Sequence, residues 1–121
     1  MSKRILVVED QADNRRIVRD LLTTQGYEII EALTGEEGVT LAATQHPDLI
    51  LMDIQLPVID GYEATRRIKA NPALRHIPII AVTSYALSGD DRQAFAAGCD
   101  AYIAKPFSPR ALLATVREYL P

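Results

Sequence analysis

Polar residues with useful chemistry follow several short apolar runs of this sequence, each close to the point where a run ends. Three are acids, two carry hydroxyls and one carries an ammonium group: Glu9, Asp10 and Asp53; Thr83 and Ser84; and Lys105. Two carboxylates about 4 Å apart repel each other by roughly 4 kcal/mol at an effective dielectric constant near 20. One lysine does not balance three acids, so if they lie together we expect either a protonated acid or a bound metal ion.

The donor atoms in this set favour a hard cation. All of the candidate ligands are oxygens, and a small cluster with room for water favours Mg²⁺ over Ca²⁺. A bound Mg²⁺ attracts phosphate oxygens, and Lys105 adds a second positive charge. The set therefore indicates phosphoryl transfer, which depends mainly on positioning and charge neutralisation. In this interpretation Asp53 is the nucleophile, and Glu9 and Asp10 hold the metal.

The segments that position these residues alternate between short apolar runs and longer stretches of helical period. The runs that we interpret as strands are 5–8, 28–30, 49–52, 77–82 and 101–103. The first, third and fourth are apolar nearly throughout, as expected for strands of a parallel sheet that is buried on both faces. The alternation predicts an α/β domain with a doubly wound, five-stranded parallel sheet and helices on both faces. Ligands of such sheets bind beyond the carboxyl ends of the strands, where the polar residues fall.

The helical segments carry start and stop signals. The expected N-caps are Asp13, Thr34, Asp60 and Ser108. Thr34 and Glu37 have capping-box spacing, and Pro109 suits the first helical position. Gly26 is expected to adopt a left-handed conformation after the first helix. The apolar face expected for that helix comprises Ile17, Val18, Leu21 and Leu22.

Composition sets limits on the class of protein. The chain has 121 residues, of which 48% are hydrophobic and 24% charged, as expected for one globular domain over residues 1–121 without an output domain. The single cysteine, Cys99, cannot form an internal disulfide, and no signal peptide or long apolar run is present, so we expect a cytoplasmic protein. A net charge of −3 argues against direct nucleic-acid binding. We expect the basic pairs Arg15-Arg16 and Arg66-Arg67 to be solvated helix faces.

Four segments of the chain together resemble the receiver domains of two-component response regulators, of the CheY type. They are ILVVEDQADN, DLILMDIQLPVIDG, IIAVTSYA and CDAYIAKPFS, and the likeness extends over essentially the whole chain. The resemblance implies a flavodoxin-like (βα)5 fold with strand order 2-1-3-4-5. The segments DLILMDIQLP and HIPIIAVTSYALSGD are most similar to single-domain cell-cycle receivers. Receiver modules of hybrid histidine kinases have similar sequences, so the alternative to a single-domain receiver is a receiver module of a hybrid histidine kinase or larger regulator.

The resemblance also implies roles for individual residues. Asp53 would accept a phosphoryl group from the phosphohistidine of a sensor histidine kinase or histidine phosphotransfer protein. Asp10 and Asp53 would bind Mg²⁺ directly, Glu9 through water, and Gln55 through its backbone carbonyl. Contacts to the phosphoryl group would come from Lys105, Thr83 and the backbone N–H of Ser84. Such a domain is a phosphoacceptor that promotes its own phosphorylation and dephosphorylation, rather than an enzyme with a separate substrate.

Phosphorylation of receiver domains changes a partner-binding face. By resemblance, Thr83 would move toward the phosphoryl group and Tyr102 would turn inward, which reshapes the face made by the fourth helix, fifth strand and fifth helix. A downstream effector protein would bind there, and we expect a monomer or weak dimer that contacts neither nucleic acid nor membrane. Gln55 and Tyr85 flank the site and would tune hydrolysis, with Tyr85 shielding the phosphoryl group from water. The bond between Lys105 and Pro106 is expected to be cis.

Three other functions compete with this interpretation. A phosphatase of the haloacid-dehalogenase type would need a second acid two residues after the nucleophile, where this chain has Gln55. Flavin mononucleotide would place its phosphate against the loop after the first strand, where Glu9 and Asp10 repel it. A phosphorylation-independent adaptor is disfavoured because the acceptor site is intact.

Overall fold

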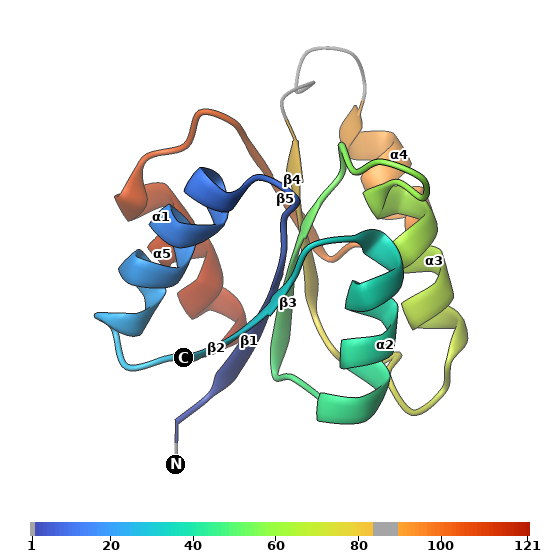
Figure 1. Cartoon of the computed structure of the whole chain (residues 1–121), viewed down its shortest axis with the longest axis horizontal. Helices are drawn as coiled ribbons and strands as arrows, with labels where there is room; N and C mark the ends of the chain where they lie inside the picture. Colours follow the sequence, from blue (N-terminus) through green and yellow to red (C-terminus); the bar gives the residue numbers. More distant parts are fainter. Residues whose placement is uncertain (1, 84–89) are drawn as a thin grey trace.

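In the computed structural model, residues 2–83 and 90–121 are described. Strands and helices alternate in the order β1 (Arg4–Val8), α1 (Ala12–Thr23), β2 (Glu28–Ala32), α2 (Gly35–Gln45), β3 (Leu49–Asp53), α3 (Gly61–Ala70), β4 (Ile79–Thr83), α4 (Asp90–Ala97), β5 (Ala101–Ala104) and α5 (Pro109–Tyr119). Within these residues the strands form one parallel sheet in the order β2-β1-β3-β4-β5 (Figure 1). The predicted flavodoxin-like fold and its strand order are confirmed.

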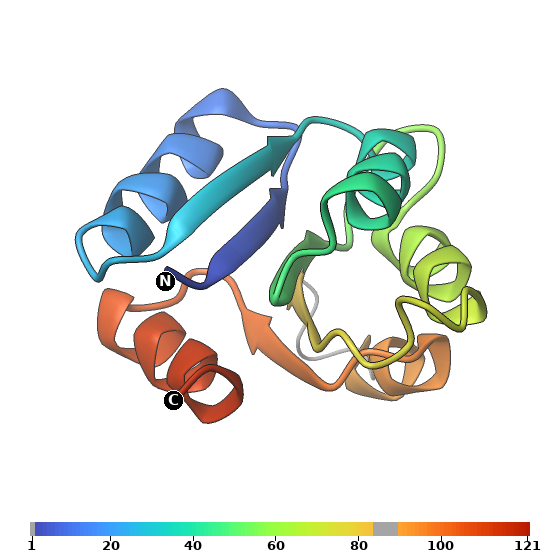
Figure 2. The same cartoon turned by 90° about the horizontal axis from the view of Figure 1, so that it is seen from below.

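Helices cover both faces of the sheet. Helices α1 and α5 lie on one face, and α2, α3 and α4 lie on the other (Figures 1 and 2). Neighbouring residues of β1 point to opposite faces, as a pleated strand requires. Ile5 and Val7 belong to the hydrophobic core under α1 and α5, whereas Leu6 and Val8 belong to the core under α2, α3 and α4.

The strands follow the apolar runs of the sequence with shifts at their ends. Strand β2 continues to Ala32, and β4 begins at Ile79 rather than at Ile77. Ile77 is buried, but its N–H donates to the carbonyl of Leu74 at 3.0 Å and so belongs to the preceding turn. The strand predicted over 77–82 therefore began too early, because Ile77 is buried in a turn rather than in the strand.

Three of the four predicted N-caps are confirmed. Thr34, Asp60 and Ser108 each accept a hydrogen bond from the backbone N–H three residues later, at 3.0, 2.9 and 3.0 Å. The prediction for Asp13 was wrong, because α1 begins at Ala12 and its N-cap is Gln11, two residues earlier, which makes no side-chain capping bond. The extended backbone of Gln11 turns the chain into the helix directly after the acidic pair. Gly26 has the expected positive φ, +90°.

The apolar face predicted for α1 is only partly buried. Leu22 is fully buried, but Ile17 is 61% exposed, so its predicted burial was wrong. A cavity of about 560 Å³ separates this part of α1 from the segment that joins β5 to α5, and Ile17 lies on its wall. Helical period identifies the inward side of a helix, but it does not say whether a neighbouring element closes over every position.

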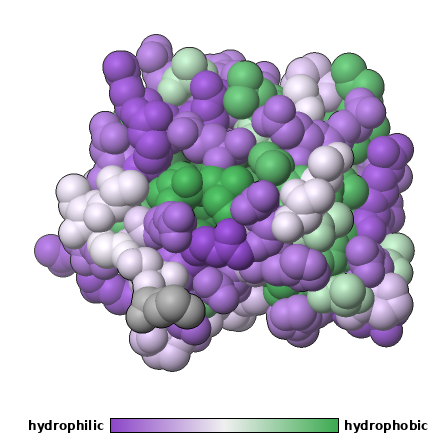
Figure 3. Space-filling model, turned by 60° about the horizontal axis from the view of Figure 1, so that its bottom comes forward, coloured by the Kyte–Doolittle hydropathy of each residue, from purple (hydrophilic) through white to green (hydrophobic). Residues whose placement is uncertain are grey.

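The surface shown in Figure 3 is largely hydrophilic, with hydrophobic side chains gathered in a recess near its middle. Among the described residues, none of the helices is both long enough and apolar enough to span a bilayer.

Candidate functional site

The register of the sheet brings the predicted site residues to one edge. Val8 of β1 pairs with Met52 of β3, so the residues that follow β1 lie level with Asp53. Asp53 in turn pairs with Val82 of β4. Thr83 pairs with Ala104, the residue before Lys105. These strand ends all lie at the upper end of the sheet in Figure 1.

Three carboxylates meet at this edge. Glu9, Asp10 and Asp53 each offer an oxygen atom, and the three atoms lie within 4.8 Å of one another. Glu9 and Asp53 are 6% and 4% exposed, whereas Asp10 is exposed. Burying charged carboxylates is costly unless they are paired or bind a metal. A cluster of oxygen donors that is open to water on one side suits Mg²⁺, which keeps several waters when it binds.

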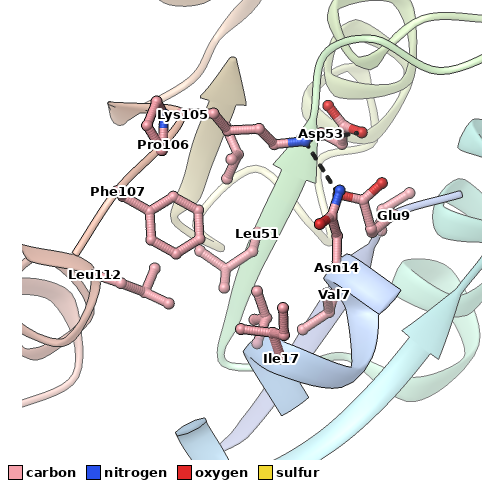
Figure 4. Close-up of a pocket in the computed structure, with 13 residues that line it drawn as sticks. Val7, Glu9, Asn14, Ile17, Leu51, Asp53, Lys105, Pro106, Phe107 and Leu112 are labelled. Atoms are coloured by element: carbon pink, nitrogen blue, oxygen red, sulfur yellow. Dashed lines mark hydrogen bonds and ion pairs between the residues drawn. The ribbon is translucent and has the colours of Figure 1, made fainter. Parts of the chain in front are cut away.

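Lys105 supplies a positive charge inside the cluster. Its Nζ lies 3.2 Å from Oε1 of Glu9 and 3.6 Å from Oδ2 of Asp53. Figure 4 shows the ammonium group reaching between these two carboxylates. The backbone N–H of Lys105 donates to the carbonyl of Thr83 at 2.7 Å, which ties the lysine to the end of β4. The bond between Lys105 and Pro106 is cis, as the resemblance implied.

Backbone N–H groups hold the two buried carboxylates in place. Oε2 of Glu9 accepts a hydrogen bond from the N–H of Gln11 at 3.1 Å, and Oδ1 of Asp53 accepts one from the N–H of Gln55 at 3.1 Å. Each acid thus binds a donor two residues further on, which leaves its other oxygen directed at Lys105. The main chain therefore orients both buried acids.

Gly61, which the sequence reasoning missed, lets α3 begin against the end of β3. A Cβ atom at this position would collide with the main chain of Asp53 and Ile54. Its N–H donates to the carbonyl of Ile54 at 2.9 Å. The signal for this role was available, because Gly61 directly follows the N-cap Asp60 and ends the segment DLILMDIQLPVIDG.

The other predicted residues fall in three environments. Thr83 is buried at the end of β4. Gln55 is partly buried and lines a hollow that Asp10 also lines. Tyr102, on β5, is half-buried against the core under α2, α3 and α4. Ser84 and Tyr85 lie outside the described residues.

The cavity of about 560 Å³ adjoins the site on the side of α1 and α5. Glu9, Asp53 and Lys105 contribute to its wall, and the rest is mostly apolar: Val7, Val8, Ile17, Val18, Leu51, Val82, Pro106, Phe107 and Leu112, with Asn14 the remaining polar contributor. In Figure 4 the charged groups lie at one end of this space and Phe107 and Leu112 lie along it. Strand β3 therefore presents Asp53 beside an apolar surface.

Comparisons with known proteins agree with this geometry. Residues 5–117 match the family described as "Response regulator receiver domain". The polar-differentiation response regulator DivK of Brucella ovis is 47% identical over 120 residues, which cover 99% of this chain and 98% of that protein. DivK of Brucella anthropi is 46% identical over the same length.

Solved structures show the same similarity. The receiver domain of the sensor histidine kinase PA1611 from Pseudomonas aeruginosa PAO1, described with a magnesium ion coordinated in its active-site cleft, is 39% identical with a TM-score of 0.93. That match covers 99% of this chain and 98% of the other. The chemotaxis response regulator CheY4 of Vibrio cholerae is 27% identical, with a TM-score of 0.93 over 98% of this chain and 99% of that one.

Proposed function

Because the chain belongs to the family of response regulator receiver domains and is DivK-like over nearly its whole length, we propose that Asp53 is its phosphoacceptor. The donor would be the phosphohistidine of a sensor histidine kinase or of a histidine phosphotransfer protein. A bond forms between an Asp53 carboxylate oxygen and phosphorus. The bond between phosphorus and the histidine nitrogen breaks, and the nitrogen keeps the electron pair.

One observation carries this proposal: Asp53 is 4% exposed, yet one of its oxygens lies 3.6 Å from the ammonium of Lys105 and the other accepts the N–H of Gln55. These two contacts orient the carboxylate, and a nucleophile requires a fixed orientation. The ammonium of Lys105 can follow the transferred group because the lysine side chain is long and its charge is not fixed to one oxygen.

The acid cluster fits a magnesium ion. Asp10 and Asp53 would be direct ligands, Glu9 would bind through water, and Gln55 would contribute its backbone carbonyl. The ion would supply positive charge that relieves repulsion between the acids and attracts phosphate oxygens. The carboxylate oxygens within 4.8 Å of one another support this assignment, as does the magnesium described in the PA1611 receiver.

Switching would follow from contacts that exist only in the phosphorylated state. Thr83, buried at the end of β4, and the N–H of Ser84 would bind phosphoryl oxygens. Tyr102, half-buried on β5, would report the change to the face made by α4, β5 and α5, where a downstream effector protein would bind. Gln55 and Tyr85 would tune the rate at which the acyl phosphate hydrolyses. The domain would promote its own phosphorylation and dephosphorylation rather than turn over a separate substrate.

A second candidate is that the same chemistry serves a phosphorelay inside a larger signalling protein. The similarity to the receiver of the histidine kinase PA1611, at 39% identity, favours it. The two candidates share Asp53 and the metal site, and they differ in whether the donor is a separate protein.

The test is labelling with a small phosphodonor such as acetyl phosphate in the presence of Mg²⁺, followed by intact mass. The wild type should gain one phosphoryl group, and Asp53→Asn should gain none. Asp60→Asn is the matched control, because it makes the same change at a carboxylate that caps α3 and should leave labelling intact. Full labelling of Asp53→Asn would contradict the proposal, and so would the absence of labelling in the wild type.

A further inference from the structure

Arg15 of α1 links the end of the first strand to the second. Its Nη1 donates to the main-chain carbonyl of Glu9 at 2.9 Å, and its Nε donates to Oε1 of Glu31 on β2 at 3.2 Å. We propose that Arg15 is a positioning residue that keeps Glu9 and Asp10 directed at the magnesium site. The inference rests on the proposed function, since it concerns the metal that those acids would hold.

The carbonyl that Arg15 binds belongs to the peptide unit between the two acids. That unit is planar, so fixing its oxygen also fixes the N–H and Cα of Asp10. The N–H of Glu9 is held separately, by the carbonyl of Ala32 at 3.0 Å. Arg15 therefore holds the peptide unit from which the exposed Asp10 projects.

The ion pair between Arg15 and Glu31 differs from an ordinary surface pair. The side chain of Arg15 is 15% exposed and that of Glu31 is 30% exposed. Arg19 adds a second contact, with its Nη1 3.4 Å from Oε2 of Glu31. Glu31 sits on β2 opposite Val7 of β1. The expectation that Arg15 and Arg16 form a solvated face was therefore wrong for Arg15, while Arg16 is 64% exposed.

Positioning and simple electrostatics predict opposite effects on metal binding. If the guanidinium acted only as a nearby positive charge, its removal would tighten Mg²⁺ binding. If it positions the acids, removal loosens binding, and lysine does not replace it, because an ammonium lacks the planar fork that reaches two acceptors at once. Groups that orient metal ligands typically contribute 10- to 100-fold to metal affinity.

The experiment is calorimetric titration of the full chain with MgCl₂, without phosphodonor, combined with urea unfolding of each variant. Arg15→Met and Arg15→Lys should each raise the Mg²⁺ dissociation constant roughly tenfold. The matched controls are Arg67→Met and Arg67→Lys, because Arg67 pairs with Glu63 at 2.9 Å on α3, away from the acids. These controls should leave the dissociation constant unchanged.

An unchanged or lower dissociation constant in both Arg15 variants would overturn the inference, even if urea unfolding showed a loss of stability, because a structural role alone does not alter the affinity of the folded protein. If Arg15→Met does not fold, Arg15→Lys decides. A wild type that binds no Mg²⁺ would overturn the metal site of the proposed function as well. Binding by the wild type with unaltered Arg15 variants would overturn only the role of Arg15.

Discussion

The ammonium of Lys105 lies 3.2 Å from a carboxylate oxygen of Glu9, a residue 96 positions away in the sequence. The same ammonium is 3.6 Å from Asp53. The lysine is therefore shared between a predicted metal ligand and the predicted phosphoacceptor. In the proposed mechanism this ammonium would leave Glu9 for the phosphoryl group, a contact change of the kind on which a switch depends.

Replacing this lysine should separate metal binding from phosphorylation. In Lys105→Met the acids lose their internal cation, so their affinity for Mg²⁺ should rise several-fold. The rate of labelling by acetyl phosphate should fall roughly tenfold or more, because the variant lacks the positive charge that we propose neutralises the transferred group. Calorimetry and a labelling time course measure the two effects.

Lys69→Met, which removes a lysine paired with Asp100 at 3.2 Å, is the control and should change neither the Mg²⁺ affinity nor the labelling rate. A Lys105→Met variant with wild-type labelling would contradict this role.

Gly61→Ala should damage the site through the backbone. The added Cβ would push α3 away from the main chain of Asp53 and Ile54, so both the free energy of unfolding and the labelling of Asp53 should drop. Gly26→Ala provides the comparison, because its φ of +90° makes alanine strained while nothing lies within 4 Å of the new atom. That variant should lose about 1–2 kcal/mol of stability and keep normal labelling. Equal labelling of the two variants would show that Gly61 has no special role.

Val58→Gly should stabilise the protein. Val58 has a φ of 70°, a region that β-branched residues rarely adopt, and the residue is 92% exposed, so it gains little from packing. Glycine relieves this strain, although it also adds conformational entropy to the unfolded chain. The net effect should be a rise of about 1 kcal/mol in the free energy of unfolding. Val58→Ala keeps the strain and should show no such gain in urea unfolding. A loss of stability in Val58→Gly would mean that the valine makes a favourable contact.

Cys99 should contribute a pH dependence at alkaline pH. Burial raises the pKa of its thiol from 9.0 to about 11. The unfolded chain then loses this proton at lower pH than the folded chain, so the stability that depends on it is complete below pH 9 and declines as the pH rises toward 11. Cys99→Ala should remove that part of the decline, which urea unfolding at pH 8, 9.5 and 11 can measure. Identical slopes for the two proteins would exclude the effect.

The sequence predicted those features that depend on local pattern. Apolar runs located the strands, and hydroxyl or acidic residues at 34, 60 and 108 located three helix starts, because each signal depends on neighbours within a few residues. The grouping of Asp10, Asp53 and Lys105 followed from one further rule, that parallel strands present their carboxyl ends at the same edge.

The features that could not be predicted from the sequence depend on how helices and strands pack against one another. The exposure of Ile17 reflects a cavity between α1 and the segment after β5, which helical period does not encode. The role inferred for Arg15 depends on β2 lying beside β1, a neighbour relation that local pattern does not supply. Gly61 matters because of which backbone lies against it, and that too is a property of the assembled sheet.

The parallel register of the sheet also makes the candidate site depend on nearly the whole fold. No segment of continuous sequence contains more than part of the acidic cluster with its lysine, since β1, β3 and the residue after β5 must all be in place. A chain that has lost only β5 and α5 keeps its acids but lacks the cation among them. Reactivity toward phosphodonors should therefore report the fraction of molecules in which β5 and α5 are folded onto the rest of the sheet.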